Sequence, residues 1–456
     1  MDSLSRSLIT LENPFNTTDE VLAWIQQRNR EVHVEVEQVP FAALKGWHFN
    51  ESTGDLQHDS GRFFSIVGLD VYTNTGCVNH WRQPIINQPE VGYLGILCKE
   101  FEGILYFLLQ AKIEPGNVNC VQLSPTLQAT RSNYMQVHGG RKPAYLDYFR
   151  NVRAGQIIID QLQSEQGARF LRKRNRNIIV RVDDDIELGE DFRWLTLAQI
   201  KQLLTHDNIV NMDTRTVLSG LRFANSTDCV SDFGQQLSAS EACMNGINTI
   251  DEILHGLSEL KTRYELVTEK VPLKDVREWM VTDTEIVRPD RLFFRVLGVN
   301  VAIDNREVAK WSQPIVQPMQ EGLSVLFARQ FGGVLHFLLQ ARVECGNFDV
   351  IEFAPTIQCL TGPHKSPIGY VPKFLAEYQS GECVREVLFD TRQSEEGGRF
   401  YHEQNHNVVC LVNEVVPEIP PENFFWLTLG QIKEFLRFNN YLNIQVRSLI
   451  SALNYV

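Results

Sequence analysis

The feature that most constrains this chain is an internal repeat about half as long as the chain itself. Shifting the 456-residue sequence by 230 positions aligns six blocks with themselves, the last after a slip of two residues. Trp81-x-Gln83-Pro84 meets Trp311-x-Gln313-Pro314, for example. Coincidence does not hold nearly one offset over six blocks, and the period is far longer than the roughly 20–50 residues of solenoid repeats. We therefore predict a tandem duplication of a domain of about 200 residues.

Composition bounds the class of protein. Hydrophobic residues make up 43% and charged residues 22%, as in a globular protein with an ample core. The net charge is −13, which argues against a nucleic-acid or anionic-membrane surface. No apolar stretch reaches the roughly 18 residues of a membrane helix, and the first residues lack a signal core. The nine cysteines include no CxxC pair, so we expect a cytoplasmic protein without disulfides.

Each copy is predicted to mix helices and strands. Alternating or continuous apolar runs mark the strands, and apolar residues at helical spacing mark the helices. We expect an α+β fold in which each half is a bent mixed sheet between helices. In the first copy the predicted strands are 63–73, 103–113, 120–123, 156–163 and 177–182, and the predicted helices are 145–150, 168–174 and 196–204.

The copies are predicted to be joined by a helical connector at residues 207–270. The domains are then 1–206, with a helix near residues 19–28, and 271–456. Ser238 and Glu241 have the spacing of a capping box, which predicts the start of a long helix in the connector.

The richest polar stretch spans residues 110–142. Gly139-Gly140 can expose backbone N–H groups near Arg131 and Arg141, which suits a diphosphate. A solvated loop whose side chains bond their own turns explains the same residues equally well.

Two further motifs have equally plain alternatives. Ser164-Glu165 recurs as Ser394-Glu395, and this pair fits a helix start with a capping serine. The basic run 172–177 loses its positive charge in the second copy, which indicates a phosphate contact in the first copy only; a solvated helix face is the alternative. Dinucleotide, P-loop, zinc-protease and serine-nucleophile motifs are all missing from the sequence.

Several long motifs stand close together in the first copy. They are Trp81-x-Gln83-Pro84, Gln88-Pro89-Glu90-x-Gly92, Leu94-Gly95-Ile96-Leu97, Gln110-Ala111-Lys112-x-Glu114-Pro115-Gly116-Asn117, the run from Gln122 to Tyr134, Asp160 to Gly167, and Lys173 to Asn177. Together these motifs resemble the NDP-hexose 2,3-dehydratases of deoxysugar biosynthesis. The resemblance covers nearly the whole chain, duplication included.

The resemblance implies a Nudix-like domain in each half and a homodimer. It implies a substrate similar to dTDP-4-keto-6-deoxy-D-glucose and a 3,4-diketo-2,6-dideoxy product for a separate 3-ketoreductase. The metal-binding Nudix motif does not occur in this sequence, so we expect a lyase with no metal and no cofactor. The alternatives are a Nudix-type nucleotide-sugar diphosphatase and a non-catalytic nucleotide-sugar-binding protein.

The implied reaction needs a base for the C3 proton, a donor to the C4 oxygen, an acid for the C2 hydroxyl and diphosphate ligands. Two candidates recur in the second copy and therefore have a structural alternative. Trp81 recurs as Trp311, and its alternative role is in the core. Glu114 recurs as Glu344, and its alternative role is to orient a turn. The acid–base candidates are Glu114, Tyr134 and His138, with Lys112 or Tyr134 at the C4 oxygen. The diphosphate candidates are Arg131, Arg141, Lys173, Arg174 and Arg176. The candidates for packing against the thymine or the sugar are Trp81 and Tyr93. Further binding candidates are Asn117, Ser124, Thr126, Gln128, Ser132, Asn133 and Glu165.

The second copy departs from these motifs. Pro115 becomes Cys345, Ser124 becomes Ala354, and residues 131–134 become Thr-Gly-Pro-His. We therefore predict that the first copy holds the active pocket, with a contribution from the second copy or from a partner subunit left open.

Overall fold

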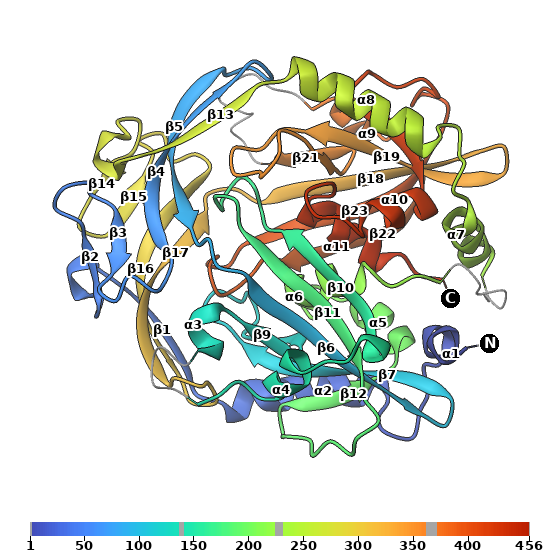
Figure 1. The fold of residues 1–456 in the computed structure, drawn as a ribbon, viewed down its shortest axis with the longest axis horizontal. Helices are drawn as coiled ribbons and strands as arrows, with labels where there is room; N and C mark the ends of the chain where they lie inside the picture. The colour runs from blue at the N-terminus through green and yellow to red at the C-terminus, as the bar shows by residue number, and fades with distance from the viewer. Residues whose placement is uncertain (1, 136–140, 224–230, 362–371, 456) are drawn as a thin grey trace.

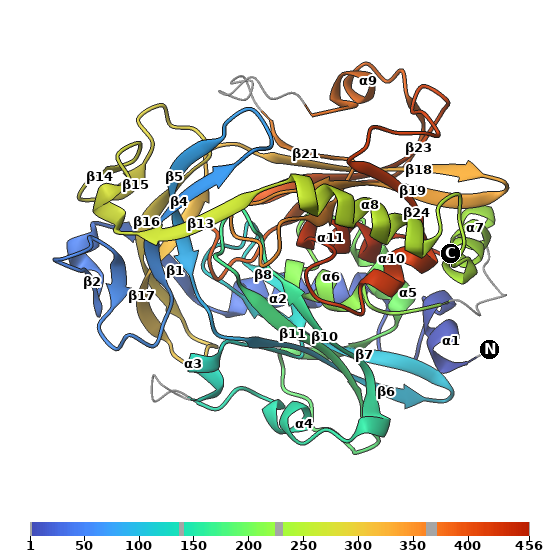
Figure 2. The same cartoon turned by 45° about the horizontal axis from the view of Figure 1, so that its top comes forward.

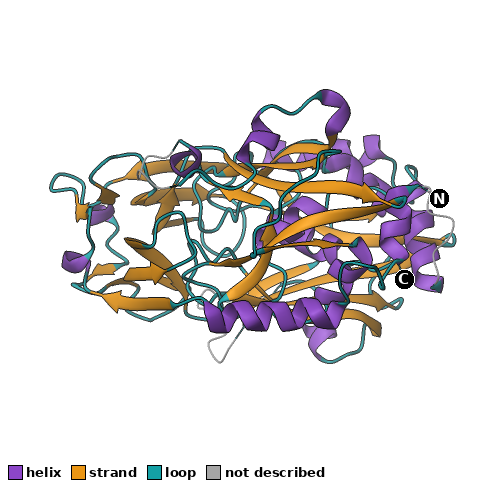
Figure 3. Cartoon of the chain, turned by 90° about the horizontal axis from the view of Figure 1, so that it is seen from below, coloured by secondary structure: helices purple, strands orange, loops and turns teal. Residues whose placement is uncertain are grey.

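The computed structural model describes residues 2–135, 141–223, 231–361 and 372–455, which form two large sheets with helices between them (Figure 1). In Figure 2 one sheet lies above and the other below a middle layer that contains α6 and α11. Most helices gather toward the end that holds both termini, whereas the opposite end consists mainly of strands and loops (Figure 3). The predicted α+β class with two sheet-rich halves is confirmed.

The first large sheet comes from the first repeat. Its central strands carry apolar residues on both faces because helices cover one face and a second apolar cluster covers the other. β11 runs parallel to β6 and the other pairs are antiparallel, so the sheet is mixed, as predicted. In spatial order it contains β10 (Ile157–Ser164), β11 (Arg174–Arg181), β6 (Gly92–Phe101), β7 (Ile104–Ile113) and β12 (Phe192–Leu195), with β8 (Val121–Pro125) on β7 and β9 (Leu127–Ala129) on β6.

The second large sheet repeats this topology strand for strand, as expected for a duplicated domain. Its parallel pair, β23 with β18, corresponds to β11 with β6. In the same order it contains β22 (Val384–Ser394), β23 (Gln404–Val412), β18 (Gly322–Phe331), β19 (Val334–Arg342) and β24 (Phe424–Thr428), with β20 (Glu352–Ala354) on β19 and β21 (Ile357–Leu360) on β18.

Two smaller sheets exchange strands between the repeats. β1 (Val34–Val39), at the start of the first repeat, pairs with β16 (Phe294–Ile303) of the second. β13 (Leu266–Val271), its counterpart, pairs with β4 (Ser65–Thr73) of the first repeat. Each small sheet is therefore built from both halves of the chain. The remaining strands are β2 (Trp47–Phe49), β3 (Leu56–His58) and β5 (His80–Asn87) in one sheet, and β14 (Met280–Val281), β15 (Glu285–Val287) and β17 (Lys310–Pro318) in the other.

Two equivalent helices, α6 (Met212–Leu218) and α11 (Ile444–Ala452), join the repeats at the centre. Arg215 on α6 donates to the Ser448 hydroxyl of α11 at 2.7 Å, and Arg447 on α11 donates to the Thr216 hydroxyl of α6 at 2.7 Å. Both guanidinium groups are buried and also bond backbone carbonyls of the opposite repeat, Ser394 and Ser164. Such charge-assisted bonds satisfy the buried cations and fix the two halves against each other.

The other helices cover the sheets or link the repeats. None of the helices in the described ranges is long and apolar enough to cross a membrane. They are α1 (Ser3–Ile9), α2 (Thr18–Glu31), α3 (Arg131–Tyr134), α4 (Leu146–Arg150), α5 (Leu197–Leu203), α7 (Asp232–Ala242), α8 (Ile250–Arg263), α9 (Leu375–Gln379) and α10 (Leu429–Phe435).

The predicted start of the long connector helix is wrong. Ser238 and Glu241 lie inside α7, which begins after the capping serine Ser231. The long helix is α8, and Thr249 and Glu252 form its capping box. These reciprocal side-chain-to-backbone bonds satisfy the free N–H groups at that point, so the helix begins there.

The predicted helix at residues 168–174 is also wrong. The segment is a turn, and strand β11 begins at Arg174. The Glu165 N–H donates to the Lys173 carbonyl at 2.9 Å, which brings the ends of β10 and β11 together. Antiparallel pairing of these strands therefore overrides the local helical pattern.

The repeated Gly-Asn motif holds the two repeats together. The Gly116 N–H donates to the Gly397 carbonyl at 2.8 Å, and a Cβ on Gly116 would lie 1.7 Å from the Phe400 carbonyl oxygen. Gly346 meets the first repeat in the same way, with its Cβ position 1.9 Å from the Phe170 carbonyl oxygen. No other residue fits where the two backbones approach so closely. This contact explains why the motif occurs in both copies.

Candidate active site

A cavity of about 610 Å³ opens between the two repeats. It is lined by β1, β6, β7 and β9 of the first repeat and by β16 and β17 of the second. Eight residues predicted from the sequence line it, together with several that were not predicted. The eight are Tyr93, Lys112, Glu114, Gln128, Ser132, Asn133, Arg141 and Lys173. The main additions are Asp213, Arg306, Trp311, Glu396, Gly398 and Arg399.

Lys112 and Glu114 form one wall of the cavity. They are two positions apart at the end of β7, so both side chains point to the same face. The Glu114 Oε1 accepts from Gln128 Nε2 at 3.0 Å, whereas its Oε2 has no hydrogen-bond partner among the described residues. Both residues are almost fully buried. An unpartnered carboxylate oxygen facing a cavity is a candidate proton acceptor.

Gln128 orients this wall. Its side-chain oxygen accepts from Ser124 at 2.7 Å and from Asn211 at 3.3 Å, which leaves its NH₂ group to bond Glu114. Its backbone carbonyl accepts from Lys112 Nζ at 3.1 Å. Burial, followed by the charge of Arg306, lowers the pKa of Lys112. Ser124 is buried, so it contributes through Gln128 rather than by touching a ligand.

Asp213 and Glu396 add carboxyl groups that the sequence analysis missed. Asp213, near the start of α6, is buried with Oδ1 unpartnered within the described ranges, and burial raises its pKa well above the usual value. Burial likewise raises the pKa of Glu396 to about 7, with Arg399 opposing the shift and the charges of Glu165 and Glu114 adding to it. Both groups therefore favour the protonated form, as general acids require.

Basic side chains line the same cavity as these acids. Lys173 is buried, donates to the Glu90 carbonyl, and has its pKa lowered mainly by burial. Arg399 donates to Gln88 at 3.0 Å and stacks over Phe64 at 4.2 Å. With Arg141 these groups form a cationic edge suited to phosphate oxygens. No three His, Cys, Asp or Glu side chains of the described residues group closely enough to hold a metal ion.

Aromatic rings flank the opening. Tyr93 lines the cavity, and Tyr134 packs edge-on against it with ring centroids 5.4 Å apart. Arg176 lies 5.5 Å above the Tyr93 ring and pairs with Asp160 at 2.6 Å. Tyr134 thus stands behind Tyr93 rather than in the lining, and burial raises its pKa.

Trp311 lines the cavity, while its counterpart Trp81 lies elsewhere, against the cluster that contains Cys345. Strand exchange explains this, because β16 and β17 of the second repeat cover the pocket of the first. Each tryptophan donates to the glutamine two residues later, Gln83 or Gln313.

The remaining candidates lie outside the lining described by the structure. Glu165 is buried and accepts from Asn175 at 2.6 Å; Ser164 ends β10 instead of capping a helix. Thr126 bridges β6 and β7 through the Leu97 N–H and the Leu108 carbonyl. Asn117 donates a hydrogen bond to the Cys120 carbonyl, and Arg174 lies over the Phe348 ring. Arg131 is exposed at the start of α3. His138 falls outside the described residues.

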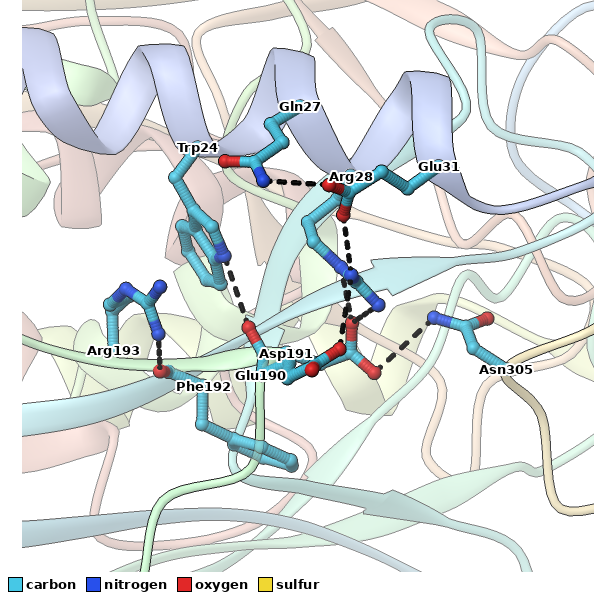
Figure 4. Close-up of polar contacts among 9 residues, drawn as sticks. All are labelled: Trp24, Gln27, Arg28, Glu31, Glu190, Asp191, Phe192, Arg193 and Asn305. Atoms are coloured by element: carbon cyan, nitrogen blue, oxygen red, sulfur yellow. Dashed lines mark hydrogen bonds and ion pairs between the residues drawn. The ribbon is translucent and has the colours of Figure 1, made fainter.

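A loop from the second repeat is fixed over the cavity. Figure 4 shows the Asp191 carboxylate between Arg28 of α2, at 2.7 Å, and Asn305, at 3.3 Å. The next residue, Arg306, donates to the Ile113 carbonyl at 2.8 Å. The turn between β16 and β17 therefore rests on the first repeat and brings Arg306 and Glu307 into the cavity wall.

Sequence comparison decides the family. The model of the NDP-hexose 2,3-dehydratase family matches this chain twice, at residues 18–221 and 250–453. The chain belongs to this family. The two matches also agree with the duplication found in the sequence.

Curated members of the family align over almost the full chain. A dTDP-4-dehydro-6-deoxy-alpha-D-glucopyranose 2,3-dehydratase of Saccharopolyspora spinosa is 45% identical, covering 98% of this chain and 93% of its own. An enzyme of the same name from Amycolatopsis orientalis is 39% identical, with 99% and 93% covered. Among solved structures, a Nudix hydrolase of M. smegmatis is 16% identical with a TM-score of 0.19, covering 29% of this chain and 81% of that one.

The missed 2,3-dehydratase residues left a trace in the sequence. Glu396 aligns with Gln166. Asn211 recurs as Asn443, and two positions after each of them Asp213 aligns with Gln445. Both are acids in one pocket and amides at the equivalent positions. Comparing the copies for changes of charge, rather than for shared residues, would have found them.

Proposed function

We propose that this protein is a hydro-lyase that removes the C2 hydroxyl of dTDP-4-keto-6-deoxy-D-glucose and forms the 3,4-diketo-2,6-dideoxy sugar. The names of its curated relatives support this substrate. The observation that carries the proposal is a cavity that combines buried acids with lysine and arginine side chains. Its volume of about 610 Å³ lies within the roughly 300–1,000 Å³ of small-molecule sites.

The substrate ketone makes the elimination possible. The C3 proton is acidic because it lies next to the C4 carbonyl, and the C2 hydroxyl lies β to that carbonyl. Removal of the proton gives an enolate, and the ketone serves as the electron sink. We assign the base to Glu114, whose Oε2 has no partner among the described residues, and the donor to the C4 oxygen to Lys112.

The nucleotide side of the substrate is assigned to the basic residues of the cavity. Lys173, Arg399 and Arg141 are the proposed diphosphate ligands, since they line the same cavity as the acids. Tyr93 and Trp311 are the proposed aromatic contacts of the thymine or the sugar.

The test is a coupled assay. The protein is incubated with dTDP-4-keto-6-deoxyglucose, a 3-ketoreductase and NADPH, and the 2-deoxy product is measured by mass spectrometry. A parallel reaction with Mg²⁺ is examined for dTMP. Formation of the 2-deoxy sugar is expected; dTMP release would instead favour a diphosphatase, and binding without turnover would favour a nucleotide-sugar-binding protein.

The cellular setting extends this proposal. We infer a cytoplasmic homodimer whose product passes to a 3-ketoreductase. All eight cysteines in the described ranges are unpaired, which supports a reducing compartment. The chain can be divided at 1–206, 207–270 and 271–456 into repeat, connector and repeat.

A further inference from the structure

Glu396 reaches the first repeat's cavity from the second repeat. It follows Glu395 in the turn after β22, and its equivalent in the other repeat, Gln166, donates a hydrogen bond to Glu395. The residue that faces Glu396 by the same symmetry is Glu165. Each pair joins one residue from each repeat, and the hydrogen-bonded amide and acid of one pair corresponds to two acids in the other. Two such acids retain a proton between them more readily than one acid alone.

A glycine near Glu396 leaves a space next to two carboxyl groups. A Cβ on Gly398 would lie 3.2 Å from Glu114 Oε1 and 3.2 Å from Glu396 Oε1. Both carboxyl groups therefore border the volume that a methyl group on Gly398 would occupy. The equivalent residue in the other repeat is Ala168, which has that methyl group.

We propose that Glu396 of the second repeat is the general acid that protonates the leaving C2 hydroxyl, with Gly398 allowing the C2–C3 edge of the hexose to approach both Glu396 and the base Glu114. The assignment deepens the proposed function and rests on it. Carbons C2 and C3 are neighbours, so an acid and a base that border one small space can serve both positions of the same sugar.

The protons balance over the cycle. Glu114 takes the C3 proton, the electron pair moves to the C4 oxygen, and the resulting enolate expels the C2 oxygen. Glu396 gives its proton to that oxygen, and water leaves. The remaining 2,3-enol gains a proton at C2 from Glu114 and returns its hydroxyl proton to Glu396. One water is lost, a 3-ketone forms, and both carboxyl groups regain their starting states.

The surroundings of Glu396 favour its protonated form far more than water does. Burial and the neighbouring Glu165 and Glu114 raise its pKa to about 7, while Arg399 and Lys173 limit the rise. An acid with a pKa near the working pH donates efficiently and is readily reprotonated.

Glu396→Gln tests the acid directly. The first repeat already accommodates glutamine at the equivalent position 166, so the fold should tolerate it. We expect kcat to fall about 10²- to 10⁴-fold, with KM changing by less than about threefold because both side chains have the same shape. The loss of kcat that accompanies deprotonation of the acid, with an apparent pKa near 7, should also disappear.

Glu352→Gln is the matched control. Glu352 is a buried acid of the same repeat whose pKa burial also raises to about 7, but it bonds Ser164 and lies outside the cavity lining. Its equivalent in the first repeat, Gln122, makes the same bond to Ser394. We expect this variant to retain wild-type kcat, so loss of activity in both variants would contradict a specific role for Glu396.

Hydrogen exchange in D₂O separates the acid from the base. Glu396→Gln retains Glu114, so it should still exchange the C3 proton of the substrate, observed by mass spectrometry, without losing water. Glu114→Gln should lose both exchange and elimination. Full turnover by Glu396→Gln, or loss of exchange together with elimination, would overturn the assignment of the acid while leaving the proposed function intact.

A second variant covers a failure of the first to fold. Glu396→Asp keeps a carboxyl group but withdraws it by one methylene, and we expect a loss of about tenfold with the alkaline limb of the pH profile retained. Unchanged kcat in this variant would contradict the placement. If the wild type does not convert the ketone at all, the proposed function fails and the assignment fails with it.

Discussion

The wall of the first repeat's cavity and the equivalent region of the second share a hydrogen-bonding frame but differ in their acids. Gln128 bonds Glu114 at 3.0 Å in the first, and Gln358 bonds Glu344 at 3.0 Å in the second. An asparagine at a helix N-cap bonds each glutamine. The frame is therefore a property of the fold and does not by itself mark an active site.

The differences lie in groups that can change protonation. Lys112 is replaced by Arg342, which pairs with Glu344 at 3.3 Å and remains charged. Asp213 and Glu396 are replaced by Gln445 and Gln166. The comparison teaches that proton transfer depends on a few side chains placed on a frame that both repeats have.

The largest expected effect is a difference in kcat between variants of Glu114 and Glu344, the two equivalent glutamates. Glu114→Gln should lower kcat about 10²- to 10⁴-fold because the base is lost while its shape remains. Glu344→Gln changes the equivalent group of the other repeat and should leave kcat within about twofold. Steady-state rates in the coupled assay measure both. Equal losses would show that the repeats are not divided as proposed.

A stability effect distinguishes Glu352 from Gln122. The pKa of Glu352 is raised to about 7, whereas an unfolded glutamate titrates near about 4.3. Its contribution to stability is therefore fully present at low pH and is lost as the pH rises through about 7. Glu352→Gln has no such loss, so its unfolding free energy relative to wild type should rise by about 2 kcal/mol between pH 5 and pH 8.

Denaturant unfolding at the two pH values measures this change. Gln122→Glu in the first repeat is the reciprocal variant and should lose stability at pH 8 relative to pH 5. A difference between Glu352→Gln and wild type that does not depend on pH would contradict the raised pKa.

The smallest expected effect concerns the space at Gly398. Gly398→Ala places a methyl group 3.2 Å from both Glu114 and Glu396, and kcat should fall about tenfold, or about 1.4 kcal/mol, as the hexose is displaced. Ala168→Gly, the reverse change in the other repeat, should leave kcat unchanged. A Gly398→Ala enzyme with wild-type kcat would show that the sugar does not occupy this space.

Much of the architecture follows from patterns within one repeat. The apolar run at residues 103–113 predicted the central strand β7, and the candidates Lys112 and Glu114 at its end both line the cavity. The offset between the copies predicted the duplicate sheet. These inferences need only local periodicity, which is why they hold.

What failed depends on contacts between the repeats. The strands at 34–39 and 266–271 have similar alternating patterns, and nothing local indicates which repeat supplies their partner. As a result Trp81 was predicted in place of Trp311. Glu396 was missed because Glu114 and Glu165, the acids whose charges raise its pKa, lie more than two hundred positions away in the chain. The turn at 168–174 became non-helical through strand pairing alone.

Strand exchange also bears on how the two repeats came to differ. A symmetric dimer of a single repeat, swapping its first strand, would form the same two small sheets, but every substitution would then appear in both copies. Joining the copies in one chain removes that constraint. One copy can carry Glu396 and Gly398 while the other keeps Gln166 and Ala168, and because strands β16 and β17 of the second repeat help to line the cavity of the first, the second repeat remains necessary to the proposed site.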